Sequence, residues 1–172
     1  MRGEVLLDRS LLVLAPVLAG GSLIPFLLGT LGAFDLHWGD GAALAWDAAL
    51  SLAFFLQHSG MVRRPVQARL ARHVKERDVR AIYAVASGAV LAAVVVFWQR
   101  TGRLFEVAGL TRWLGLTVFA LGLAGYAWGV RSLGHFDPFG IRAIYAHRHG
   151  RPLAPAPMAV RGAYRWVRHP LY

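Results

Sequence analysis

The stretch from Leu11 to Leu31 contains no charged residue and is long enough to cross a bilayer as a helix. A hydrocarbon core about 30 Å thick requires roughly 20 mostly apolar residues in helical conformation. A signal peptide would have a shorter apolar core and a cleavage pattern of small residues before a soluble domain, so we interpret this stretch as a retained span. The chain is therefore restricted to the folds that a membrane permits.

Three further segments are predicted to span the membrane, although the first of them is interrupted by Asp47, Gln57 and His58. We therefore predict an all-α fold, a polytopic transmembrane helix bundle with four spans. Their expected bounds are about 11–31, 41–61, 81–98 and 113–130. Pro16 and Pro25 predict a kink in the first span. No repeat or linker is evident, so residues 1–172 are predicted to form a single membrane domain.

Lys and Arg residues are concentrated on alternate connections between the predicted spans. Of the 19, 16 lie before the first span, between the second and third, or after the fourth, and three lie in the other two connections. Basic residues near span ends are retained in the cytoplasm. We therefore predict an integral protein of the inner (cytoplasmic) membrane with both ends of this chain cytoplasmic. Four tryptophans then fall at outer span ends, where indole rings favour the headgroup region: Trp38, Trp46, Trp98 and Trp113.

The composition excludes several classes of function. The formal net charge of +10 would suit a nucleic-acid binder, but the basic residues lie between apolar runs rather than on a soluble face, so no nucleic-acid partner is expected. The absence of cysteine excludes disulfides, thiolate metal sites and a cysteine nucleophile. The expected partners are the lipid bilayer and a small or lipophilic ligand, and the oligomeric state is left open.

The chemically informative segment is 131–172, which is rich in Arg, His, Pro and aromatic residues. A basic tail of this kind could bind anionic lipid headgroups, each Lys or Arg contributing about 1 kcal/mol near the surface. Binding to headgroups does not require the glycines of this segment or Pro138. It also does not require a proline directly after the Arg168-His169 pair. We therefore interpret the segment as a cytoplasmic or interfacial binding segment.

Its last residues carry an ordered motif. The run GAYRWVRHPLY, residues 162–172, resembles the G-x-Y-R-x-V-R-H-P-x-Y motif of membrane methyltransferases related to isoprenylcysteine carboxyl methyltransferase. The stretch GHFDPFG at 134–140 and Gln57-His58-Ser59 narrow the resemblance to the branch that contains methanethiol S-methyltransferase and NnrU-type membrane proteins. The resemblance covers most of the chain from about Gln57 onward.

This resemblance implies S-adenosylmethionine as cofactor, bound at the membrane–cytoplasm boundary. The cofactor-binding residues that it implies are Tyr164, Arg165, Arg168, His169, Pro170 and Tyr172. Arg168 could pair with the cofactor carboxylate, because a guanidinium offers two parallel donors. Tyr164 or Tyr172 could face the sulfonium, because aromatic faces attract cations. Arg and aromatic residues are also common at membrane boundaries as snorkelling and belt residues.

Methyl transfer to a thiol requires alignment, exclusion of water and a thiolate nucleophile. Since a free thiol is mostly protonated at neutral pH, a nearby base would help. The candidate catalytic bases are His58 and His135, and the sequence does not choose between them. His58 is a polar residue near the end of an apolar helix, a position that is costly unless it serves a site or reaches water.

Other polar residues have a structural interpretation. Asp47 lies three helical turns from His58, near the predicted outer boundary, and is assigned to packing or to the interface. Asp137 precedes Pro138, which favours a turn with an Asx-type cap and equally permits a functional role. His147 and His149 lie beside arginines in a basic loop, and no metal site is expected.

The resemblance implies an S-adenosylmethionine-dependent methyltransferase acting on a small or lipophilic thiol, with methanethiol converted to dimethyl sulfide as the first choice. One alternative acceptor is a prenylcysteine carboxylate or another lipid-soluble group. Another alternative is a non-enzymatic, NnrU-like accessory protein of nitrogen-oxide metabolism. Val79 stands before Arg80 and Tyr83 where relatives carry an acidic residue. The family continues past Tyr172 with a hydrophobic hairpin and a Glu-containing motif, so we expect a C-terminally truncated chain that is inactive by itself.

Overall fold

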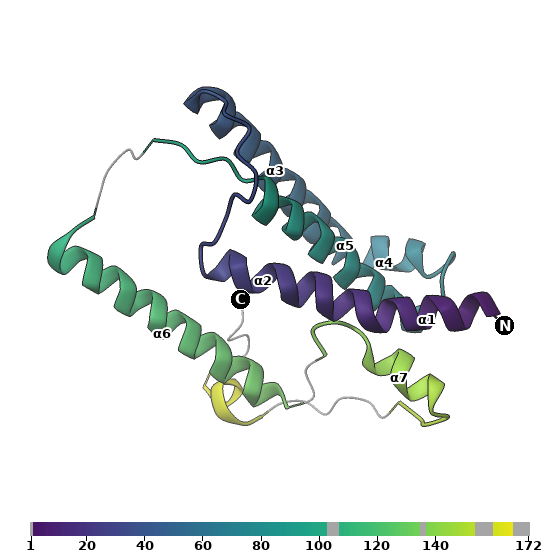
Figure 1. Cartoon of the computed structure of the whole chain (residues 1–172). Coiled ribbons are helices and arrows are strands. Elements are labelled where there is room, and N and C mark those ends of the chain that lie inside the picture. The colour runs from purple at the N-terminus through teal and green to yellow at the C-terminus, as the bar shows by residue number, and fades with distance from the viewer. Residues whose placement is uncertain (1, 103–106, 135–136, 154–159, 167–172) are drawn as a thin grey trace. The chain divides into compact units, whose positions relative to one another are not determined.

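The computed structural model describes residues 2–102, 107–134, 137–153 and 160–166. Every regular element within these ranges is helical, which confirms the prediction of an all-α chain. The chain packs as two compact units (Figure 1). Unit 1 comprises residues 1–102 and 137–153, and unit 2 comprises residues 103–136 and 154–172. The expectation of a single domain stays a prediction.

The first apolar stretch forms one helix that contains a π-helical turn. It consists of α1 (Arg2–Ala15), η1 (Pro16–Gly20) and α2 (Gly21–Leu27). Pro16 has no N–H and cannot continue the α-helical bonding pattern, so the irregular turn begins there, where the sequence predicts a kink. The helix ends before Leu31 because Gly29 adopts a φ of +67° and Gly32 N donates to Val95 O.

The remaining helices of unit 1 are α3 (Asp40–Met61), α4 (Arg64–Leu70), α5 (Glu76–Phe97) and α7 (Arg142–Arg148). Unit 2 contains α6 (Gly109–Leu133) and the 3₁₀ turn η2 (Gly162–Arg165). α6 ends at Gly134, whose φ of +67° is favourable for glycine and strained for other residues.

Three helices in the described ranges, rather than the four predicted, are long and apolar enough to cross a membrane. They are Gly3–Leu27, Glu76–Phe97 and Gly109–Leu133. α3 has the predicted helical bounds to within one residue, but Asp47, Gln57 and His58 lower its hydropathy, so its length alone misled the sequence interpretation. Three apolar helices still identify a membrane protein.

Helix α5 is the central element of unit 1. The first helix runs parallel to it, because Glu4 pairs with Lys75 at one end and Gly32 bonds to Val95 at the other. α3 runs antiparallel to α5, as Figure 1 shows. Three segments therefore lie at the end of unit 1 where α5 begins (Figure 1): the start of α1, the whole of α4 and the whole of α7.

The core of unit 1 is small and built mostly from alanine and aliphatic residues. Its buried members are Leu11, Ala15, Ala81, Ala84 and Ile144. Small residues let the helices approach closely. A Cβ at Gly88 of α5 would lie 2.6 Å from the Leu18 carbonyl carbon and 2.8 Å from Ala19 Cα in η1. The irregular turn of the first helix therefore packs directly on α5.

Candidate functional site

His58 in the last turns of α3 faces Tyr83 of α5. The Tyr83 hydroxyl lies 3.0 Å from His58 Nδ1 and 3.2 Å from Nε2. One turn earlier on α3, the Phe54 ring stacks on the imidazole with centroids 5.2 Å apart. The imidazole is thus oriented by two neighbours and remains exposed on its other side. A histidine held in this way can accept a proton from a ligand.

The neighbouring Gln57 joins the same two helices. Its Nε2 lies 3.3 Å from Ser87 Oγ on α5 and 3.1 Å from Met61 Sδ one turn further along α3. Its Oε1 is buried and has no hydrogen-bond donor among the described residues. Gln57 therefore fixes the end of α3 on α5, and the next residue, His58, presents its imidazole.

At the opposite end of α3, Asp47 has a structural role. Its side chain is 5% exposed and its Oδ1 accepts the backbone N–H of Gln99 at 2.9 Å. The Gln99 side chain donates to Phe34 O and Phe97 O, and it accepts the Leu36 N–H. This network joins the loops that follow α2 and α5, in agreement with the exclusion of Asp47 from the site.

The described part of the GHFDPFG stretch, Asp137 to Gly140, docks α7 on unit 1. The Asp137 carboxylate accepts the N–H groups of Ile141 and Arg142 at 3.2 and 2.8 Å and so holds the start of α7. Gly140 has a φ of +67°, and a Cβ there would lie 2.6 Å from Ala81 N. Only glycine fits this approach to α5 without movement. The structure thus supports the structural interpretation of Asp137.

In unit 2, the first half of the C-terminal motif forms η2 and packs on the end of α6. Ser132 Oγ donates to Trp128 O at 2.6 Å and accepts the Ala163 N–H at 3.1 Å. Ala163 is buried, Tyr164 is half-buried and Arg165 is exposed. The turn is therefore anchored on α6 and carries Tyr164 and Arg165 at consecutive positions.

The other predicted site residues lie outside the described residues. They are His135, Arg168, His169, Pro170 and Tyr172. Of the predicted residues that the structure describes, Tyr164 and Arg165 share the turn η2 of unit 2, whereas His58 belongs to unit 1. The assignment of these residues to catalysis and cofactor binding stays a prediction.

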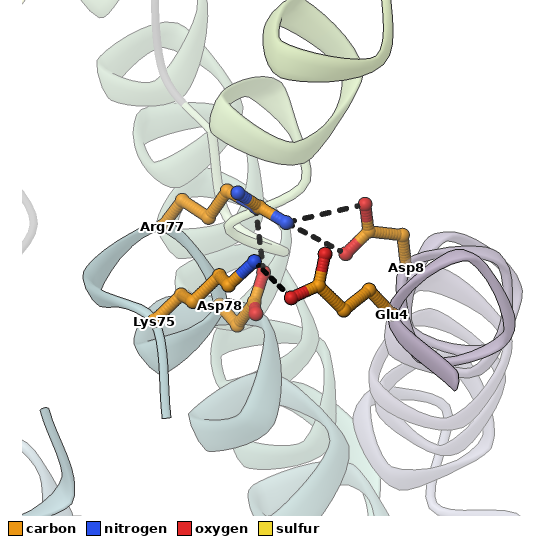
Figure 2. A network of polar contacts seen from close by, with 5 residues as sticks. All are labelled: Glu4, Asp8, Lys75, Arg77 and Asp78. Atoms are coloured by element: carbon orange, nitrogen blue, oxygen red, sulfur yellow. Dashed lines mark hydrogen bonds and ion pairs between the residues drawn. The ribbon is translucent and has the colours of Figure 1, made fainter. Parts of the chain in front are cut away.

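The sequence interpretation missed an ionic network between α1 and the start of α5, which Figure 2 shows. Arg77 Nη2 lies 3.4 Å from Asp8 Oδ1, and Arg77 Nε lies 3.5 Å from Asp78 Oδ1. Lys75 Nζ contacts Glu4 Oε1 at 2.6 Å. The signal was present in the sequence, because Glu4 and Asp8 are four residues apart and so share one face of the first helix.

His149, the residue that follows α7, has its imidazole on Tyr145. His149 Nδ1 lies 2.8 Å from Tyr145 O, and the two rings stack with centroids 4.0 Å apart. Within the ranges that the structure covers, no three His, Asp or Glu side chains are grouped so as to hold a metal ion.

Comparison with known proteins identifies relatives of the chain. It is 32% identical to methanethiol S-methyltransferase of Crocosphaera subtropica over 139 residues, which are 76% of this chain and 52% of that protein. It is 33% identical to methanethiol S-methyltransferase of a Pseudomonas species over 162 residues, 87% of this chain and 60% of the relative. Nurim of Rattus norvegicus is 30% identical over 141 residues, 76% of this chain and 53% of nurim.

These relatives confirm the resemblance to the isoprenylcysteine carboxyl methyltransferase-like membrane proteins that the C-terminal motif indicated. The chain spans between about half and three fifths of the length of the relatives just described. No family model matches the chain, and no solved structure matches it.

Proposed function

We propose that this chain, a membrane protein related to the methanethiol S-methyltransferases, takes part in S-adenosylmethionine-dependent methylation of a small thiol. Methanethiol is the proposed acceptor and dimethyl sulfide the product. The observation that carries the proposal is the 32–33% identity to two proteins named methanethiol S-methyltransferase over 76% and 87% of this chain. The ordered C-terminal motif agrees with it.

The donor chemistry of η2 suits the proposed methyl donor. S-adenosylmethionine supplies a methyl group on a sulfonium and carries a carboxylate. The exposed guanidinium of Arg165 offers two donors to a carboxylate, and the half-buried ring of Tyr164 offers an aromatic face to a cation. We assign Arg168, His169, Pro170 and Tyr172 to the same site, because they continue the motif directly from this turn.

The proposed base for the thiol is His58. Its imidazole would accept the proton of the S–H group, and the thiolate sulfur would then bond the methyl carbon of the donor. The bond between that carbon and the sulfonium sulfur would break at the same time, so S-adenosylhomocysteine is the leaving group. Tyr83 is a positioning residue, because its hydroxyl lies 3.0 Å from His58 Nδ1 and holds the ring against rotation. His135 remains the alternative base.

We also propose that the end of unit 1 where α5 begins faces the cytoplasm. α4 lies at this end together with Arg72, Lys75 and Arg77, and α7 adds Arg142 and Arg148. Basic residues of this density near span ends are retained on the cytoplasmic side.

Headspace analysis of cells that express a version of the protein with the full length of its relatives tests the proposal. We expect dimethyl sulfide above the level of an empty-vector strain when methanethiol is supplied. His58→Ala should reduce it by a factor of about 10²–10⁴, the usual contribution of a general base. His149→Ala is the matched control, because His149 is an exposed histidine that contacts only its own helix in the described structure. If the protein methylated a prenylcysteine carboxylate and formed no dimethyl sulfide, a lipid-soluble acceptor would replace methanethiol in the proposal.

A further inference from the structure

A cavity of about 320 Å³ opens beside the ionic network at the charged end of unit 1. Its wall is formed by the start of α1, the connection between α4 and α5, and the first turn of α5. Leu7 and Val74 contribute apolar surface, and His73 and charged side chains supply the rest. α1 and α5 both belong to candidate membrane spans that begin here, so the cavity lies at the level of the headgroups rather than of the hydrocarbon.

Each of the three carboxylates that line this cavity is paired with a basic side chain. Glu4 is paired with Lys75, while Asp8 and Asp78 share the Arg77 guanidinium (Figure 2). The side chains of Asp8 and Asp78 are 7% and 2% exposed, so their charge is directed at Arg77 rather than at the opening. The acidic residues therefore do not make the cavity selective for a cation.

The unpaired charge at the opening is positive. Arg72 lines the cavity, is exposed, and has no ion-pair partner among the described residues. It belongs to the segment 62–75, which contains four arginines and one lysine and no acidic residue. An anion at the opening would thus meet a guanidinium with free donors and a positive field from the same segment.

We propose that this cavity binds the phosphate of an anionic phospholipid headgroup, with Arg72 as its principal donor. The apolar surface of Leu7 and Val74 suits the glycerol and the first acyl carbons of the same lipid. A lipid is favoured over a soluble phosphate compound, because the cavity lies where two candidate spans begin and is therefore supplied from the bilayer. This inference is independent of methyl transfer and goes beyond it.

Native mass spectrometry of the purified full chain tests the inference. The detergent-solubilised protein is mixed with equal amounts of dioctanoyl phosphatidylglycerol and dioctanoyl phosphatidylcholine, and the bound lipid is identified by mass. We expect phosphatidylglycerol adducts to dominate. Arg72→Gln should weaken phosphatidylglycerol binding roughly fivefold, the effect of one basic residue near a membrane surface. Arg9→Gln is the matched control, because Arg9 is an exposed arginine at the same end of α1 that does not line the cavity.

Three outcomes would overturn the inference. Equal binding of the two lipids would remove the preference for an anionic headgroup. An equal loss in Arg72→Gln and Arg9→Gln would mean that the effect is general attraction to the surface and not a site. Complete displacement of phosphatidylglycerol by inorganic phosphate at an equal concentration would identify a site for a free anion instead of a lipid.

Discussion

Replacing Arg77 with Met removes the guanidinium that two buried carboxylates share. Arg77 lies 3.4 Å from Asp8 and 3.5 Å from Asp78, so both acidic groups lose their counter-charge in one substitution. Met keeps most of the aliphatic stem of Arg, and lost packing therefore contributes little. The variant holds two like charges close together in surroundings from which water is largely excluded.

Breaking a buried ion pair by deleting one partner costs about 3–5 kcal/mol, because the remaining charge stays desolvated. The Arg77 side chain is 17% exposed, so some water reaches the site and we expect the unfolding free energy to fall by about 3 kcal/mol. Lys75→Met in the same network is the control. Its partner Glu4 is more than half exposed, and the loss of such a screened pair should change stability very little.

The assay is the midpoint of thermal unfolding in detergent, followed by the helical circular dichroism signal. Arg77→Met should lower the midpoint clearly, and Lys75→Met should leave it near the parent value. Adding Asp8→Asn to Arg77→Met should restore part of the loss, since one of the two unpaired charges disappears. Equal midpoints for the two single variants, or no recovery in the double variant, would refute the reasoning.

Three further predictions concern packing and orientation. Gly88→Ala places a Cβ against the backbone of η1 and should lower the unfolding free energy by about 1–3 kcal/mol in thermal denaturation, whereas Gly60→Ala, which meets open space, should not. Ser132→Ala leaves the Ala163 N–H without its acceptor; it should cost about 1–3 kcal/mol and increase proteolysis near η2. Cysteines at Ala71 and Ala143 should react with an impermeant maleimide only after cells are opened, and labelling in intact cells would reverse the proposed orientation.

The sequence predicted the helices well because apolar length is a strong signal in a membrane protein. Pro16 marked the irregular turn of the first helix, and residues 81–98 and 113–130 lie almost entirely within α5 and α6. The error concerned α3. Its length suits a span, but Asp47 and the polar residues at its end reduce its apolarity, and the interpretation gave these residues too little weight.

The candidate site residues could be named from the sequence, but their contacts could not be predicted from it. His58 stood out as a polar residue in an apolar helix, but its pairing with Tyr83 depends on the register between α3 and α5, which periodicity does not determine. The anchoring of η2 by Ser132 depends likewise on a contact between residues 31 positions apart. The ionic network was missed because the first span was started at Leu11, which left Glu4 and Asp8 outside the predicted helix.

The most direct test of the central claim is methyl transfer by the purified membrane protein. A version of the protein with the full length of its relatives is incubated with methanethiol and S-adenosylmethionine carrying a labelled methyl group, and the label is measured in the volatile fraction. We predict labelled dimethyl sulfide from the parent protein and from His149→Ala, and a loss of at least about a hundredfold in His58→Ala. Label in dimethyl sulfide at the same rate from His58→Ala would contradict the assigned base. Failure of the parent protein to produce any labelled dimethyl sulfide would contradict the proposed function itself.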